Sequence, residues 1–233
     1  MSPEPTKPGT TNGAYAPLRQ ALAVRPLDAP VLVGAREVWQ AGDLIAAVDE
    51  LSGELAGNRT GCRSLAVLAD NGPAWIIADL AALAAGIVHV PLPAFFSAGQ
   101  LAHVLDAGGV DAVLTDQPER ILALQRGFAV DGRRHGLIRF RRQPADPVSL
   151  PCGTAKLSFT SGSTGQPKGA CLTAAGLLDT ARAVADRLAD LPLPRHLATL
   201  PLALLLENVA GVHAALLAGA EIHLPGLQAL GWQ

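Results

Sequence analysis

Residues 64–91 read SLAVLADNGPAWIIADLAALAAGIVHVP and contain the pattern that decides the fold. The run 64–69 is apolar and ends in turn-forming residues, which is typical of a strand buried on both faces of a parallel sheet. Pro73 can open a helix because the first helical position needs no N–H donor, and Gly86 can end it. Residues 87–90 are apolar again, so this stretch predicts a strand, a helix and a second strand.

The same alternation extends to both sides of this stretch. Strands are expected at 30–35, 64–69, 87–90, 111–115, 155–159, 196–200 and 220–224, and helices at 41–55, 74–85, 97–107, 118–126, 173–191 and 207–218. Strands that alternate with helices at this spacing predict an α/β fold with parallel-sheet layers and flanking helices.

Composition changes divide the chain into three segments. Residues 1–17 are rich in Pro, Thr and Gly and predict a disordered tail. A first α/β subdomain is expected over 18–150, and a second subdomain, incomplete at its C-terminal end, over 151–233. Between them, residues 131–153 combine five arginines with three prolines. A solvated connecting loop is favoured there over a phosphate-binding patch.

Charge and cysteine content exclude several classes of protein. The 233 residues contain 18 Lys+Arg and 20 Asp+Glu, a net charge of −2, which argues against a nucleic-acid partner. No apolar run reaches the roughly 18 residues of a membrane span. Cys62, Cys152 and Cys171 form no CxxC pair, so neither a disulfide framework nor a zinc site is expected. A reducing, cytoplasmic location is the simpler interpretation.

The segment 157–173, LSFTSGSTGQPKGACLT, carries the predicted chemistry. An apolar strand runs into a turn rich in hydroxyls and glycines, which is followed by a lysine. Glycines let a ligand approach the backbone N–H groups, successive N–H groups form a concave anion site, and lysine adds positive charge. This pattern predicts a polyphosphate site made by Thr160, Ser161, Gly162, Ser163, Thr164, Gly165 and Lys168.

Two commoner motifs do not fit this segment. A Walker loop counted from Gly162 would need Gly at Pro167 and Ser or Thr at Gly169, so a P-loop kinase or ATPase is disfavoured. A hydrolase elbow centred on Ser163 would need Gly at Ser161. A flexible surface turn is a weaker alternative, because linkers rarely place Pro-Lys-Gly directly after an apolar strand.

The motif FTSGSTGQPKG resembles the phosphate-binding signature of the adenylate-forming superfamily, which includes acyl-CoA synthetases, luciferases and peptide-synthetase adenylation domains. Residues 65–116 resemble the opening α/β region of that superfamily. Residues 200–224, with Leu-Pro-Leu-Ala followed by Glu-Asn-Val, are most similar to its long-chain fatty acyl-CoA synthetase branch. The resemblance covers about residues 30–230, which would form the N-terminal part of the large domain of such an enzyme.

The resemblance implies an ATP-dependent acid–thiol ligase. A carboxylic acid, in this branch a fatty acid, attacks the α-phosphate of ATP, and coenzyme A takes the acyl group from the resulting adenylate. By position, residues 160–165 would wrap the β- and γ-phosphates, Lys168 would be the catalytic cation that neutralises them, and Thr160 would approach Mg²⁺. These donors would stabilise charge on the leaving pyrophosphate.

Several family features are absent from this sequence. The Tyr-Gly-x-Thr-Glu motif, the ribose-binding Asp and the lysine of the small C-terminal domain do not occur. Leu204 and Ala174 also stand where the family often has His. An N-terminal fragment, inactive alone, is therefore expected, with a missing C-terminal half as partner or with self-association. Exposed apolar surface is expected over 202–206 and 214–224. The alternative is a non-catalytic nucleotide- or phosphate-binding remnant or regulatory module.

The remaining polar candidates are given structural interpretations. The six histidines show no metal-ligand spacing and are expected at strand edges or on the surface: His89, His103, His135, His196, His213 and His223. Cys171 is expected to be a small buried residue on a strand. Glu207 fits a helix start, where a carboxylate is favourable. Asp79 is expected on the exposed face of its helix.

Overall fold

The structure is a computed structural model that describes residues 12–57, 62–143, 148–160, 166–191 and 193–232. Its strands form two sheets, one of seven strands in the order β6-β7-β5-β3-β4-β8-β9 and one of four in the order β10-β11-β1-β2. The strands are β1 (Pro30–Gly34), β2 (Val38–Gln40), β3 (Ser64–Leu68), β4 (Val88–Pro91), β5 (Ala112–Thr115), β6 (Ala129–Arg134), β7 (Leu137–Arg141), β8 (Thr154–Thr160), β9 (Lys168–Thr173), β10 (Arg195–Leu197) and β11 (Glu221–Leu224).

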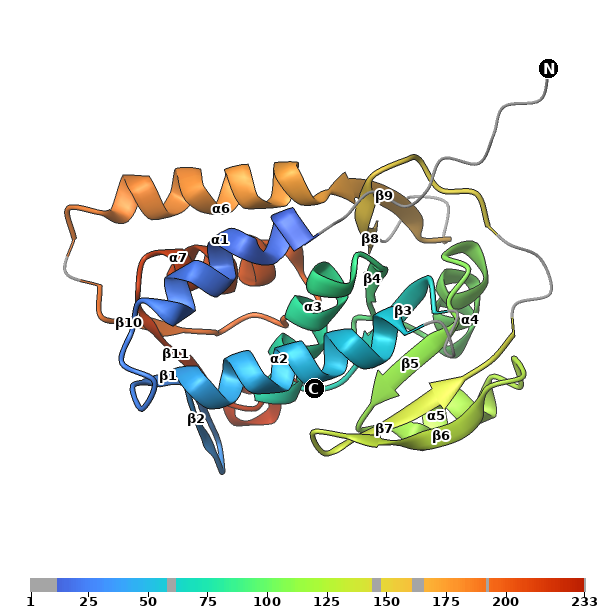
Figure 1. The fold of residues 1–233 in the computed structure, drawn as a ribbon. Helices are drawn as coiled ribbons and strands as arrows, with labels where there is room; N and C mark the ends of the chain where they lie inside the picture. Colours follow the sequence, from blue (N-terminus) through green and yellow to red (C-terminus); the bar gives the residue numbers. More distant parts are fainter. Residues whose placement is uncertain (1–11, 58–61, 144–147, 161–165, 192, 233) are drawn as a thin grey trace, which may run out of the picture.

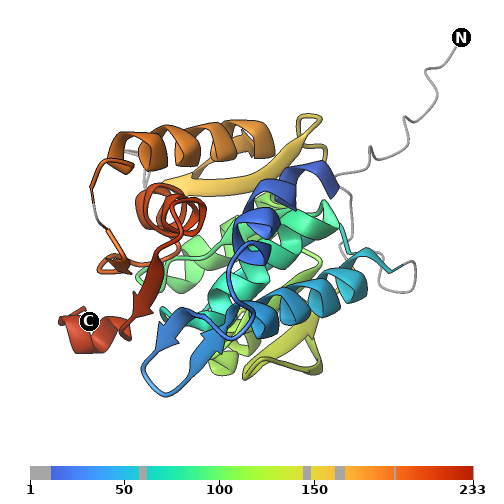
Figure 2. The same cartoon turned by 60° about the vertical axis from the view of Figure 1, so that its left-hand side comes forward.

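Helices pack on both faces of the larger sheet (Figure 1). They are α1 (Asn12–Ala23), α2 (Ala41–Ala56), α3 (Pro73–Ala85), α4 (Ala98–Ala107), α5 (Pro118–Ala123), α6 (Ala174–Leu188) and α7 (Ala214–Leu217). A π-helix, η1, covers Leu206–His213, and a 3₁₀-helix, η2, covers Leu227–Leu230. Figure 2 shows α6 and β9 on one side of the molecule, next to the coil formed by η1 and α7.

The parallel core predicted from the apolar runs is confirmed. Strands β5, β3, β4 and β8 are neighbours and run parallel. All five residues of β3 are buried, as expected for a strand covered on both faces. Antiparallel strands continue the sheet at each edge, where β7 pairs with β5 and β9 pairs with β8.

Helix α3 lies between the two sheets, since it contacts β1 of the smaller sheet and β3 and β4 of the larger one. Its apolar residues surround the helix almost completely, and such a helix is buried on all sides. Pro73 opens α3, and Gly86 ends it in the left-handed conformation that glycine favours. Helix α4 begins with a capping box between Ser97 and Gln100, at the predicted position.

Two segments that composition predicted to lack regular structure form a helix and a strand hairpin instead. Residues 12–17, expected in the tail, belong to α1, because Tyr15 and Leu18 are buried in the core; residues 1–11 lie outside the described part. The Arg-rich segment expected as a connecting loop contains the β6–β7 hairpin. His135 and Gly136 join the hairpin with φ of 47° and 85°, the positive values that a tight two-residue hairpin turn requires.

The core draws on both predicted subdomains. Strand β8 joins β4 in the larger sheet, and β11 joins β1 in the smaller one, so each sheet combines strands from before and after residue 150. The prediction that residues 202–206 and 214–224 expose apolar surface is largely wrong, because Leu202, Leu216 and Leu224 are buried. In the described part, the exposed leucines near this region are Leu188, Leu191, Leu193, Leu197 and Leu206.

None of the helices in the described ranges combines the length and the apolar character needed to cross a bilayer.

Candidate functional site

The β8–β9 hairpin brings together the two ends of the predicted phosphate loop. Thr160, the last residue of β8, pairs across the antiparallel ladder with Lys168, the first residue of β9. Both residues are exposed. The predicted site residues Ser161, Gly162, Ser163, Thr164 and Gly165 lie outside the described residues. The structure therefore places a hydroxyl and an ammonium group at one end of the sheet.

Close packing behind the hairpin explains the glycine that follows Lys168. A Cβ atom on Gly169 would lie 3.0 Å from Cδ1 of Leu157 and 3.1 Å from the ring of Phe159. Both neighbours are buried side chains of β8, so they have little freedom to move. Gly169 thus leaves room for the Leu157 and Phe159 side chains of the paired strand β8 at the base of the loop.

Helix α4 supports the far end of the loop. His103 lies 3.1 Å from the carbonyl oxygen of Pro167, measured from Nε2, and it meets the ring of Phe159 edge-on at 6.3 Å. Because a carbonyl only accepts, Nε2 carries the proton and donates it. A small cavity of about 240 Å³, partly lined by Gln100 and Gln166, adjoins this contact. His103 thus contacts the end of the predicted loop, and its sequence context did not single it out.

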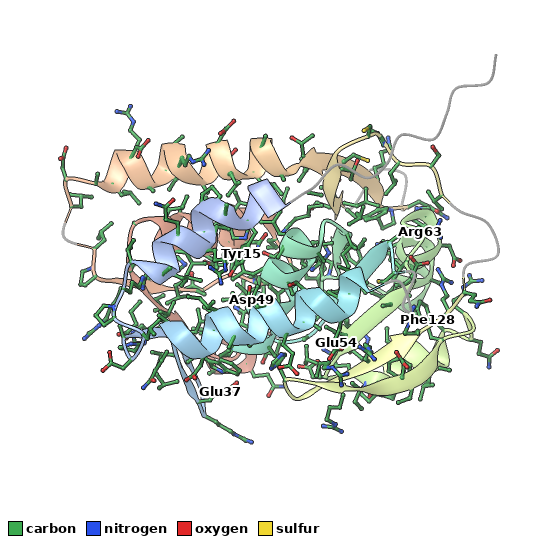
Figure 3. All side chains as sticks on the ribbon, viewed as in Figure 1. Tyr15, Glu37, Asp49, Glu54, Arg63 and Phe128 are labelled. Atoms are coloured by element: carbon green, nitrogen blue, oxygen red, sulfur yellow. The ribbon has the colours of Figure 1, made fainter. Side chains whose placement is uncertain are left out.

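Four of the five arginines in segment 131–153 form ion pairs, which favours a structural role over a phosphate-binding patch, although the segment is not the expected loop. Arg134 and Arg139 both bind Glu54 of α2, at 2.7 and 2.8 Å. Figure 3 shows Glu54 directed from α2 toward the hairpin. Arg142 binds Asp106 at 2.9 Å. These guanidinium groups hold the hairpin against α2 and α4.

A buried polar cluster lies between the sheets. We call it the Asp79 cluster; its members are Asp79 of α3, His89 of β4, Lys156 of β8, and Asn208 and His213 of η1, each at most 2% exposed. One carboxylate oxygen, Oδ1 of Asp79, accepts from His89 Nδ1 and Lys156 Nζ, both at 2.6 Å. The other, Oδ2, accepts from Asn208 Nδ2 and His213 Nε2, both at 2.8 Å. Lys156 also donates to Asn208 Oδ1.

The geometry fixes the charges of the Asp79 cluster. Burial by itself raises the pKa of Asp79, but the Lys156 ammonium and the histidine contacts hold that pKa well below its usual value. Burial lowers the pKa of Lys156, and Asp79 opposes this effect. Burial also lowers the pKa of His89, so the cluster contains an ion pair with neutral His89 at pH 7.

Four residues differ from their expected positions, three of them in the Asp79 cluster. Asp79 is buried rather than exposed because α3 has no solvent-facing side, and the apolar residues around it in the sequence were a signal of this. His89 and His213 are interior donors to Asp79, not strand-edge or surface residues. Cys171 lies on a strand as expected, but it is exposed because β9 is an edge strand.

Glu207 anchors the other side of η1. As expected, it lies in the first turn of the helix, but it is also buried. Its Oε2 accepts from the backbone N–H groups of Thr199 and Leu200 at 3.0 and 2.9 Å, and Oε1 lies 2.7 Å from Nε2 of His196. Polar contacts therefore fix η1 both to the Asp79 cluster and to the turn that precedes it.

Two larger cavities flank η1. One, of about 600 Å³, lies between β9, α6 and η1 and is lined largely by small and apolar residues, among them Cys171, Leu177 and Val209. The other, of about 630 Å³, lies between the end of α6, β10 and α7. Within the described ranges, no group of three or more His, Cys, Asp or Glu residues is arranged to hold a metal ion.

Comparisons with known proteins show which proteins this chain resembles. A probable non-canonical nonribosomal peptide synthetase from Salinispora arenicola is 30% identical over 179 residues, which is 74% of this chain and 2% of that protein. Human long-chain-fatty-acid–CoA ligase 6 is 26% identical over 155 residues, 52% of this chain and 22% of the ligase. The ATP-bound structure of MatB from Rhodopseudomonas palustris superimposes with a TM-score of 0.68 at 20% identity, covering 92% of this chain and 45% of MatB.

The chain thus spans less than half the length of each of these proteins. The similarity to MatB shows the fold, with sheets and helices matching a large part of this chain. The family description "AMP-binding enzyme" matches residues 18–230, which include both sheets, the β8–β9 hairpin and η1. This chain belongs to the AMP-binding enzyme family, whose members form adenylates.

Proposed function

We propose that the chain supplies the phosphate-binding part of an ATP-dependent acid–thiol ligase that works through an acyl-adenylate. The observation that carries this proposal is the juxtaposition of Thr160 and Lys168 at the exposed end of the β8–β9 hairpin. The family match over residues 18–230 supports ATP as the nucleotide.

The residues at the hairpin suit a polyphosphate. Lys168 presents a mobile ammonium group, and Thr160 presents a hydroxyl that can donate to a phosphate oxygen or act as an oxygen ligand of Mg²⁺. Residues 161–165 add hydroxyls and backbone N–H groups by their sequence. In this proposal Lys168 is the catalytic cation, because it opposes the negative charge that builds on the leaving pyrophosphate.

We propose a carboxylic acid as the second substrate and a fatty acid as its first candidate. The cavity of about 600 Å³ beside β9 supports an acid with a hydrocarbon part, because its lining is mostly apolar. Coenzyme A is the proposed thiol. We further propose that these 233 residues do not catalyse the reaction alone and that the C-terminal half present in longer family members, or self-association, completes the site.

The test is ATP–pyrophosphate exchange with a panel of fatty and aromatic carboxylic acids. It compares the chain alone, the chain co-expressed with a C-terminal half from a family member, and the same pair carrying Lys168→Ala. We expect no exchange by the chain alone, acid-dependent exchange by the pair, and a loss of about 10²–10³-fold in the variant, the usual cost of one transition-state donor.

The alternative is a non-catalytic phosphate-binding module. Binding of ATP without exchange in every combination would favour this alternative. Strong acid-dependent exchange by the chain alone would contradict the proposed need for a second half.

A further inference from the structure

The Asp79 cluster joins β8, which leads into the phosphate loop, to η1, which lies beside the apolar cavity next to β9. The proposed phosphate chemistry uses none of its side chains. The cluster nevertheless satisfies the Asp79 carboxylate fully, because four side-chain donors occupy its two oxygens. A carboxylate bound in this way can fix the positions of all the elements that supply its donors.

The geometry of η1 depends on this carboxylate. Asn208 and His213 are five residues apart, and both donate to the same oxygen, Oδ2 of Asp79. In a π-helix, hydrogen bonds join residues five apart, so such residues lie nearly above one another. In an α-helix of 3.6 residues per turn they would be separated by about 140° around the axis. Asp79 therefore favours the π-helical register over the α-helical one.

Lys156 extends this connection to the phosphate-loop strand. Its ammonium group donates both to Asp79 Oδ1 and to Asn208 Oδ1, so a single cation contacts α3 and η1. Lys156 lies four residues before Thr160 on the same strand. A shift of β8 at the base of the loop therefore moves a group that is hydrogen-bonded to η1.

General stability is a poor explanation for such a cluster. Well-packed apolar residues of similar volume often replace a buried ion pair without loss of stability. π-helical segments, in turn, occur frequently at functional sites. Both considerations favour a role in positioning η1 for the chemistry at the loop.

We propose that Asp79 and Lys156 are positioning residues that hold η1 in its π-helical register and couple that register to the phosphate loop, so that polyphosphate bound at the loop stabilises η1. The coupling rests on the proposed function. The control of helix register does not, and it can be tested on the protein without ligand.

The first test measures amide hydrogen exchange in the free protein, with Lys156→Met as the variant. Methionine keeps most of the length of the side chain but removes the ammonium group. We expect exchange in peptides covering 206–213 to accelerate by about tenfold relative to α2 and β11, because local opening follows the loss of local contacts. Arg133→Met, which removes an exposed cation from the β6–β7 hairpin, should leave these peptides unchanged. An acceleration shared equally with α2 and β11 would overturn the proposed control of register.

A second variant covers the case in which Lys156→Met does not fold. Asn208→Ala removes one η1 donor but keeps the Asp79–Lys156 ion pair. It should also accelerate exchange in 206–213 selectively. Unchanged exchange there would overturn the proposal.

The ligand test adds inorganic pyrophosphate with Mg²⁺ and follows binding by calorimetry and η1 by hydrogen exchange. In the wild type, pyrophosphate should slow exchange in 206–213. In Lys156→Met, pyrophosphate should still bind, within about threefold of the wild-type affinity, without this protection. Binding without protection in the wild type would overturn the coupling and leave the proposed function intact. Absence of pyrophosphate binding by the wild type would contradict the proposed function, and the coupling with it, while the free-protein result still decides the control of register.

Discussion

His89 makes the stability of the fold depend on pH. Its imidazole is buried in β4, where Asp79 of α3, Lys156 of β8 and His213 of η1 face it. Burial lowers the pKa of His89, and Asp79 offsets only part of this effect. As the pH falls through about 6.5, the usual value for His, the unfolded chain takes up a proton that the folded chain refuses. The free energy of unfolding therefore falls below that pH, and His89 contributes no pH dependence above it.

Urea denaturation at pH 7.5 and pH 5.5 measures this effect. The decrease in the free energy of unfolding that His89 causes is at most about 1.4 kcal/mol per pH unit below 6.5. His89→Gln keeps a side-chain donor for Asp79 but cannot be protonated, so its stability should fall less between the two conditions. An equal pH dependence in the wild type and the variant would show that His89 is not responsible.

The three thiols should differ in reactivity. Cys62 is buried, and burial raises the pKa of its thiol to about 11, whereas Cys152 and Cys171 are exposed. Since the thiolate is the reactive form, Cys62 should resist alkylation at pH 8 and react only on unfolding. Mass spectrometry after iodoacetamide treatment should show two additions in the native protein and three in urea, with Cys62→Ala stopping at two. Rapid addition to Cys62 in the native protein would contradict its buried position.

At the residue scale, the sequence predicted which neighbouring residues of one motif lie together better than it predicted which distant residues pair. Thr160 and Lys168 belong to a contiguous motif, and the structure brings them together. Asp79 and Lys156 are 77 residues apart, and their pairing depends on how α3 packs against β8. The local sequence shows that Asp79 and Lys156 are charged residues within apolar segments, but it does not identify their partners.

Gly211 of η1 has little room for a side chain. A Cβ atom there would collide with Oε1 of Glu207 and lie 2.9 Å from Nε2 of His196, and both groups are already bonded to each other. Gly211→Ala should therefore lower the free energy of unfolding by about 1–3 kcal/mol, the usual cost of overpacking. Urea denaturation measures this change.

Gly53 is the matched control. It lies inside α2 with open space around its Cβ position, so Gly53→Ala should raise stability by about 0.5–1 kcal/mol through helix propensity. Opposite signs for the two substitutions are the expected result. A stabilising effect of Gly211→Ala would contradict the close contact with Glu207.

At the element scale, burial decided which strands and helices the sequence could predict. Residues 64–68 and 112–115 are fully buried strands with clear apolar runs, and both were predicted. β6 and β9 are exposed edge strands, whose charged or mixed residues lack that signal. Helix α1 contains Pro17 in its interior. An interior proline argues strongly against a helix, but tertiary packing overrides that signal here.

At the scale of the whole molecule, each of the two sheets pairs strands that are far apart in the sequence. The smaller sheet needs β11, from the end of the described chain, beside β1 near its beginning. The larger sheet places β8 beside β4, which lies more than 60 residues earlier. Alternation along the sequence predicted parallel-sheet layers with flanking helices but not this long-range strand order, because strand order depends on which apolar faces meet across the fold.

The same long-range order places the proposed phosphate site. Its hairpin stands at the edge of the larger sheet, with α4 contacting it on one side and α6 following directly after β9 on the other (Figure 1). If the hairpin binds polyphosphate through Lys168, losing that ammonium group must weaken binding. The loss of an exposed cation elsewhere on the surface should leave polyphosphate binding unchanged.

Calorimetric titration of Mg²⁺·ATP into the wild type, Lys168→Ala and Arg182→Ala tests this claim most directly. Arg182 lies on the exposed face of α6 and loses the same formal charge. We expect weak ATP binding by the wild type, affinity about ten- to a hundredfold lower in Lys168→Ala, since a charge-assisted contact is worth about 1.5–3 kcal/mol, and unchanged affinity in Arg182→Ala. Equal affinity in the wild type and Lys168→Ala, or the absence of ATP binding by the wild type, would contradict it.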